Sequence, residues 1–152
     1  MRHLLIIVAL ALITSCVKPD TSSMPFEHID GDVWHSDYPI EIVPQWSDSA
    51  ATYTMLITVR HTQAYPYANL PMTLDMIGDS GQVKRQRLNV DITDGHGNWV
   101  GQGFGTLYQR QVVALRGVKP RQANRVKLWM ALEGCDSVLG VSDMGITLII
   151  EH

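Results

Sequence analysis

Aromatic side chains beside expected turns are the residues of this sequence best suited to recognise a ligand. Two tyrosines stand in the stretch Tyr65–Leu70, and a tryptophan and a third tyrosine flank a glycine-rich run further on. Such rings offer a broad apolar surface with a polar tip at low entropic cost. We therefore expect a surface for another protein or for sugar rings; the alternative is that the rings only hold their own loops in place. The candidate contact residues are Tyr65, Tyr67, Asn69, Trp99 and Tyr108.

Three glycines alternate in the run after Trp99, at Gly101, Gly103 and Gly105. Because successive strand residues point to opposite faces, this spacing removes the side chains from one face of a strand. A bare strand face indicates that something packs closely on the backbone. A neighbouring strand or ring would be the structural explanation, and an approaching partner or ligand the functional one. Gly101 and Gly103 therefore join the candidate contact residues.

The only nucleophile arrangement that the sequence offers combines Ser80 with His61 or His96. The segment Gly78–Gly81 reads Gly-Asp-Ser-Gly, the same letters that surround the nucleophile of chymotrypsin-like serine proteases. Those enzymes need two barrels, a histidine base and a buried aspartate. This chain is too short for that, and Gln82 stands where a further glycine is expected. Since the same composition is common in hairpin turns, we expect a turn here and no enzymatic activity.

The charged and metal-binding residue types indicate no metal, cofactor or nucleic-acid site. The histidines stand singly, without a pair three to five residues apart. The segment 94–98 has glycines and polar residues suited to a turn, but it lacks the alternating carboxylates of a calcium loop. The formal net charge is −3 and the basic residues form no long stripe, whereas binding to phosphates requires one.

The amino terminus has the layout of a bacterial lipoprotein signal. Arg2 precedes an apolar run over Leu4–Ile13, which is too short to span a bilayer as a helix, and Thr14 and Ser15 precede Cys16. We expect a diacylglyceryl group on the Cys16 thiol and cleavage just before it. Loss of Arg2 with the leader would change the formal net charge from −3 to −4. Two or three acyl chains would then anchor the protein to a membrane.

This reading divides the chain into a signal peptide over 1–15, a lipidated tether over 16–25 and a folded domain over 26–152. Val17 is not the acidic residue that retains some lipoproteins at the inner membrane, which favours the outer membrane; we expect attachment on its periplasmic face. If Cys16 carries lipid, Cys135 has no partner for a disulfide, and we expect it to be a buried thiol.

Period-two alternation of apolar and polar residues is typical of strands and dominates the remaining sequence. It predicts strands over 52–60, 70–76, 82–92, 126–132 and 146–150, with shorter ones over 39–43, 105–109 and 111–116. No stretch sustains helical spacing. Seven to nine short strands separated by turns point to an all-β fold. We expect a single antiparallel β-sandwich, with a β-barrel as the alternative.

Several short motifs, taken together, resemble the gliding-motility lipoprotein GldH family, and they agree with it in order and spacing. These motifs are Arg60–Thr62, Tyr65–Leu70, Asp94–Gly97, Trp99–Gly103, Leu107–Tyr108 and Leu139–Gly145. The resemblance implies a non-enzymatic, cofactor-free lipoprotein of the cell envelope on the outer membrane. Its partners would be envelope proteins of a motility or secretion apparatus, which the chain would serve as a scaffold or accessory component. The alternative from the aromatic residues is a carbohydrate-binding lipoprotein.

Overall fold

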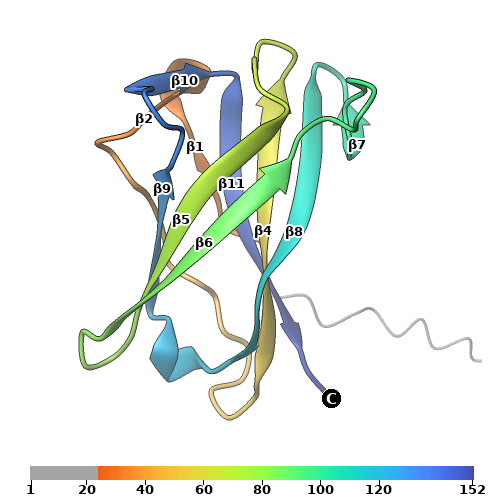
Figure 1. The fold of residues 1–152 in the computed structure, drawn as a ribbon. Coiled ribbons are helices and arrows are strands. Elements are labelled where there is room, and N and C mark those ends of the chain that lie inside the picture. Colours follow the sequence, from red (N-terminus) through yellow and green to blue (C-terminus); the bar gives the residue numbers. More distant parts are fainter. Residues whose placement is uncertain (1–23) are drawn as a thin grey trace, which may run out of the picture.

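The computed structural model describes residues 24–152 as an all-β domain (Figure 1). The expected signal peptide and Cys16 lie outside the described residues. The strands are β1 Phe26–His28, β2 Val33–His35, β3 Ile40–Ile42, β4 Tyr53–Thr62, β5 Asn69–Ile77, β6 Val83–Asp91, β7 Gln102–Phe104, β8 Leu107–Val118, β9 Arg125–Met130, β10 Ser137–Leu139 and β11 Val141–Ile150. Two single-turn 3-10 helices, Asp30–Asp32 and Pro120–Gln122, interrupt them. Within the described part, no helix has the length and apolar character needed to cross a membrane.

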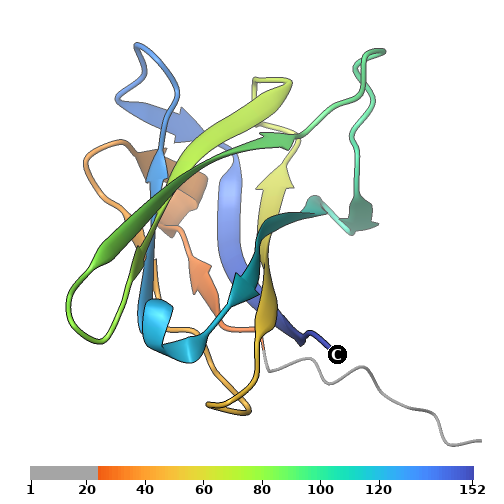
Figure 2. The same cartoon turned by 60° about the horizontal axis from the view of Figure 1, so that its bottom comes forward.

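The strands form an antiparallel sandwich, as the sequence predicts. One sheet has the order β1-β11-β4-β8-β7 and the other β3-β9-β5-β6, and Figures 1 and 2 show them as two facing layers. A small β10-β2 pair joins them at one end. Both large sheets keep free edge strands, so the barrel alternative is wrong. Five strands of only three residues each raise the strand number above the expected seven to nine. The segments 105–109 and 111–116, expected as separate strands, belong largely to one strand, β8.

The period-two pattern places one face of each long strand in the core. Met55, Ile57 and Val59 of β4 are fully buried and belong to the same core cluster as Leu74 of β5 and Leu128 of β9. Burying side chains of this size stabilises the fold by roughly 1.5–3 kcal/mol each. The inward phase of β4 thus forms the centre of the sandwich.

The outward face of β4 is less exposed than alternation alone predicts. Thr58 has no exposed surface although it points away from the core. The Nε2 group of Gln111 lies 3.0 Å from the hydroxyls of both Thr58 and Thr147, so one amide covers two neighbouring strands. Polar side chains can be buried on this face because they form hydrogen bonds with one another.

The outer face of the second sheet is held by an ionic network around Asp75. Arg85 donates to both carboxylate oxygens of Asp75, over 2.6 and 2.7 Å, and the Trp129 indole donates to one of them over 3.1 Å. The guanidinium of Arg85 and this indole hold the pKa of Asp75 below its ordinary value, although burial opposes the shift. A two-pronged arginine–carboxylate contact of this kind fixes the register of β5 against β6.

Several loops gather at one end of the sandwich, opposite the end that holds the carboxyl terminus. The connections from β4 to β5 and from β9 to β10, together with β7, lie at the top of Figure 1, whereas the carboxyl terminus and the β5–β6 hairpin lie at the bottom. Phe26 pairs with Gly145 and His28 with Asp143 in antiparallel register. Strand β1 therefore runs antiparallel to β11, toward the end that holds these loops.

Candidate functional site

Four rings form an aromatic cluster at the loop end of the sandwich: His61, Tyr65, Trp99 and Tyr108. The imidazole of His61 lies at its centre, with ring centroids 5.1 Å from Trp99, 5.6 Å from Tyr108 and 6.1 Å from Tyr65. Trp99 and Tyr108 also contact each other at 5.5 Å. The end of β4, the loop after it, the loop before β7 and the start of β8 each contribute one ring. The structure therefore brings together three of the aromatic residues that the sequence singled out.

His61 was not among the contact residues expected from sequence, yet it organises the cluster. Its side chain has no exposed surface, and its Nδ1 lies 3.1 Å from the Thr62 carbonyl oxygen. Burial lowers the pKa of His61, since it disfavours the charged imidazolium. Nδ1 therefore carries the proton and donates it to the carbonyl, while Nε2 is buried without a partner among residues 24–152. The sequence did contain an indication of this position, because His61 follows Val59 in the alternation that points side chains of β4 into the core.

Tyr65 and Tyr67 have opposite roles despite their closeness in sequence. Tyr65 is 2% exposed and donates its hydroxyl to the Asn69 carbonyl oxygen over 2.8 Å, so it holds its own loop in place. Burial raises the pKa of this hydroxyl well above its ordinary value. Tyr67 is 41% exposed and lies edge-on to Tyr65, with its hydroxyl 3.3 Å from the Cys135 sulfur. Only Tyr67 of this pair offers a ring to solvent.

The remaining expected contact residues surround the cluster. Asn69 is exposed at the start of β5, and Trp99 and Tyr108 are half-buried. The amide of Gln63 donates to the Tyr108 hydroxyl over 3.3 Å. Beside this contact, a pocket of about 310 Å³ lies between the end of β4 and the β7–β8 turn. Stacking of a sugar ring requires an exposed ring face, and Tyr65, which was expected to share in such a surface, has none.

Close approach of backbones explains two glycines near the cluster. A Cβ on Gly101, whose φ is +118°, would lie 2.2 Å from the Gln109 carbonyl oxygen, so the neighbouring strand β8 requires this glycine. A Cβ on Gly103 would only touch the Tyr108 ring at 3.9 Å. The sequence analysis missed Gly140, where φ is +95° and a Cβ would lie 2.3 Å from the Tyr65 backbone nitrogen. The neighbouring strand therefore explains why Gly101 is a glycine. It does not explain Gly103, so the alternative of an approaching partner remains for that residue.

The residues considered for a hydrolase are not brought together. Ser80 lies in the β5–β6 hairpin, and its hydroxyl bonds to the Gln82 side chain. His61 and His96 both lie near the other end of β5 and β6, remote from the hairpin that holds Ser80. A nine-residue strand is about 26 Å long, well beyond the hydrogen-bond reach that a general base requires.

Two further expectations concern single residues. Cys135 packs against the core but is only half-buried, so the thiol is less buried than expected. Asp94 accepts backbone hydrogen bonds from His96 and Asn98 over 2.8 and 2.9 Å, which makes 94–98 the expected structural turn. Across residues 24–152, no three metal-ligating side chains lie close enough to hold an ion.

Comparison with known proteins agrees with the motifs. A sequence profile of the GldH lipoprotein family matches residues 23–148. The chain is 24% identical over 147 residues to a "Gliding motility lipoprotein GldH homolog" of Christiangramia forsetii, covering 91% of this chain and 89% of that one. It is 23% identical over 121 residues to the "Gliding motility lipoprotein GldH" of Flavobacterium johnsoniae, covering 76% of each.

A capsid protein of infectious bursal disease virus, VP2, overlaps 86% of this chain and 33% of its own, with a TM-score of 0.36 and 15% identity. That overlap is too weak to carry an argument. The profile match, in contrast, spans nearly the whole described domain, including the aromatic cluster and Gly140. This chain belongs to the GldH lipoprotein family.

Proposed function

We propose that this chain is a non-catalytic lipoprotein of the outer membrane, anchored on the periplasmic face by lipid on Cys16. In this proposal residues 1–15 are removed, 16–25 form the tether, and the sandwich from residue 26 onward serves as a scaffold or accessory component of a motility or secretion complex. Membership of the GldH family is the observation that carries the proposal.

The arrangement of the two ends of the domain supports it. Strand β1 runs toward the end that holds the aromatic cluster, so its first residue, Phe26, lies farther from the cluster than its last. A tether over 16–25 would reach at most about 35 Å when extended. A lipid on Cys16 would therefore hold the domain within this distance of the bilayer, where another envelope protein could contact the cluster.

The exposed part of the loop end is the surface we propose for that contact. Tyr67 and Asn69 are exposed, and the half-buried rings of Trp99 and Tyr108 pack on the buried His61. Rigid rings that lose little entropy on binding are typical of protein interfaces. At Gly103 a Cβ would make only ordinary contact with the Tyr108 ring, so the backbone there leaves room for a partner's side chain to approach.

The anchor is tested by replacing its cysteine. We expect Cys16→Ser to abolish lipidation, seen by mass spectrometry of the amino-terminal peptide, and to release the protein from the outer-membrane fraction. Cys135→Ser is the matched control and should leave both unchanged. An intact leader or an unmodified thiol at position 16 in the wild-type protein contradicts the proposal.

The contact surface is tested in the native host. We expect the double variant Tyr67→Ala and Asn69→Ala to reduce recovery of envelope partners in a pull-down and to impair motility or secretion. Ser80→Ala, at the opposite end of the sandwich, is the control for an exposed substitution. If complete deletion of the chain leaves motility, secretion and the envelope complexes unchanged, the proposed role is wrong.

A further inference from the structure

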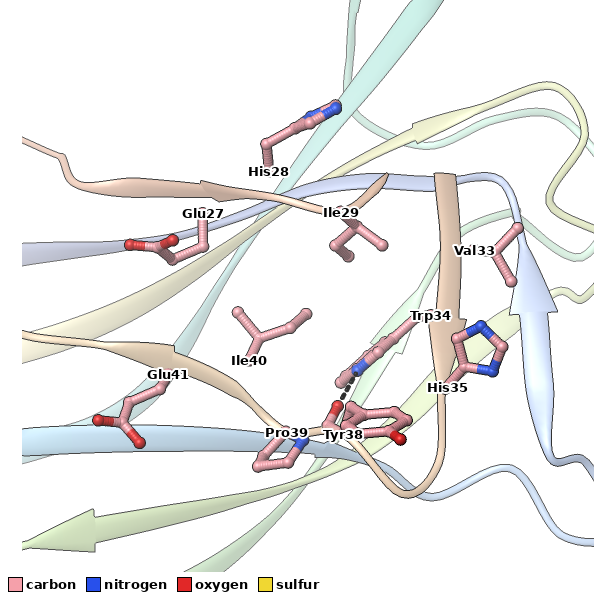
Figure 3. A pocket seen from close by; sticks show the side chains of 10 residues that line it. All are labelled: Glu27, His28, Ile29, Val33, Trp34, His35, Tyr38, Pro39, Ile40 and Glu41. Atoms are coloured by element: carbon pink, nitrogen blue, oxygen red, sulfur yellow. Dashed lines mark hydrogen bonds between the residues drawn. The ribbon is translucent and has the colours of Figure 1, made fainter. Parts of the chain in front are cut away.

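A lateral pocket of about 440 Å³ opens at the side of the sandwich, between β1 and β3 (Figure 3). These two strands are the edges of the two large sheets on the same side, and each has only three residues. The pocket is defined here by Glu27, Ile29, Trp34, Tyr38 and Ile40. It lies away from the aromatic cluster and shares no residue with it.

The base of the lateral pocket is apolar and fixed. Trp34 is 2% exposed, and its indole nitrogen donates to the Tyr38 carbonyl oxygen over 3.2 Å. Figure 3 shows Ile29 and Ile40 pointing toward each other across the opening. Tyr38, at the rim, is 72% exposed, the largest exposed fraction among the exposed large hydrophobic residues of the described chain. The pocket thus offers a preformed apolar floor and an uncovered ring beside it.

A carboxylate without a cation borders this apolar space. Glu27 of β1 has the same phase as Ile29, which follows the strand, and it lies on the pocket side, whereas His28 points away from the pocket. Among residues 24–152, no lysine or arginine lies within ion-pair distance of Glu27. Glu41, in contrast, already forms ion pairs with Arg125 at 3.0 Å and with Lys127 at 3.4 Å.

The chain segment that supplies the pocket residues is rich in acidic side chains. Residues 24–59 contain six acidic residues and neither lysine nor arginine. The acidic residues are Glu27, Asp30, Asp32, Asp37, Glu41 and Asp48. Arg125 and Lys127 lie on this side as well, but both pair with Glu41, and the guanidinium of Arg60 lies over the Phe26 ring. The unpaired Glu27 carboxylate would therefore attract a further cation, and the apolar floor would favour one that carries a long aliphatic stem.

We propose that the lateral pocket receives a lysine or arginine side chain from an extended segment of another envelope protein. The aliphatic stem would lie along Ile40, with the cationic head near Glu27. The exposed Tyr38 ring, at the other end of the pocket, would contact a neighbouring residue of the segment. The Ile29 amide donates to the Ser142 carbonyl oxygen on β11 over 2.8 Å. Because successive residues of a strand direct their backbone groups to opposite sides, those of His28 point to the free edge of β1. The segment can add to that edge as a further strand.

The test uses the full chain in its native host, with a photo-crosslinking phenylalanine analogue at position 38. We expect crosslinks to another protein, with a lysine or arginine within about three residues of the linked site, since successive same-face residues of a strand lie about 7 Å apart. Glu27→Gln should lower the yield about fivefold, the loss expected for one charge-assisted contact. Asp48→Asn, an acidic residue of the same segment outside the pocket, is the matched control.

The remaining outcomes overturn the inference. A crosslinked peptide of this same chain would indicate a second copy, and a peptide without a basic residue would exclude the proposed chemistry. Absence of any crosslink at position 38, when the analogue at position 67 still captures a partner, would show an unoccupied lateral pocket. The inference rests on the proposed function only in requiring an envelope partner, and that last outcome would leave the proposed function intact.

Discussion

Substitution of Gly140 by alanine tests how the loop end is held together. Gly140 joins β10 to β11 and has a φ of +95°. Its amide donates to the Asp32 carbonyl over 2.7 Å, and its carbonyl accepts from the Thr62 amide over 2.8 Å. A Cβ would lie 2.3 Å from the Tyr65 nitrogen and 2.7 Å from its Cα. Since those atoms are backbone, no side-chain rotation can relieve the overlap.

The expected loss follows from these contacts. A left-handed conformation costs an alanine about 1–2 kcal/mol. Separating the two backbones would also weaken two hydrogen bonds, each contributing about 1 kcal/mol. We therefore expect Gly140→Ala to lower the free energy of unfolding by about 3–4 kcal/mol. Gly134→Ala is the matched control: its φ is +71° but nothing lies within 4 Å of the added Cβ, so about 1–2 kcal/mol should be lost.

Urea unfolding followed by circular dichroism measures both variants. With a slope of about 2 kcal/mol per molar urea, Gly140→Ala should unfold roughly 1.5–2 M earlier than the wild-type protein. The aromatic signal in the near ultraviolet should also change, because Tyr65 belongs to the cluster. Equal losses for the two alanine variants, within about 0.5 kcal/mol, would refute the close backbone approach at Gly140.

Three further predictions concern buried polar groups. Tyr65→Phe removes the hydrogen bond to the Asn69 carbonyl and should cost about 1 kcal/mol in urea unfolding; an unchanged midpoint would contradict it. Because Arg85 keeps the folded-state pKa of Asp75 below 3.8, its stabilisation is complete above 3.8 and is lost as the pH falls through the lower folded value. The midpoint difference between wild type and Asp75→Asn should therefore close in acid, and a difference independent of pH would count against the ion pair. Burial lowers the pKa of His61 below 6.5, so wild-type stability should fall as the pH drops below 6.5, and His61→Phe should show a shallower fall.

The sequence by itself determined the class of fold and the family. Alternation over 52–60 and 70–76 predicted β4 and β5 because side chains of a strand point to alternate faces, and that local rule needs no knowledge of the partner strands. The turn at Gly78–Gly81 followed from residue types alone. The motifs also sufficed to indicate the GldH family, and most of the aromatic residues of the cluster were identified before their positions were known.

Only the tertiary structure decided which of these residues meet. It placed His61 at the centre of the rings, buried Tyr65 while leaving Tyr67 exposed, and separated Ser80 from both histidines. The lateral pocket likewise exists because β1 and β3, distant from their partner strands in sequence, end up as edges on the same side. Periodicity records which face of a strand is apolar, but it carries no information about the strand that packs opposite, and contacts between distant segments are set by that packing.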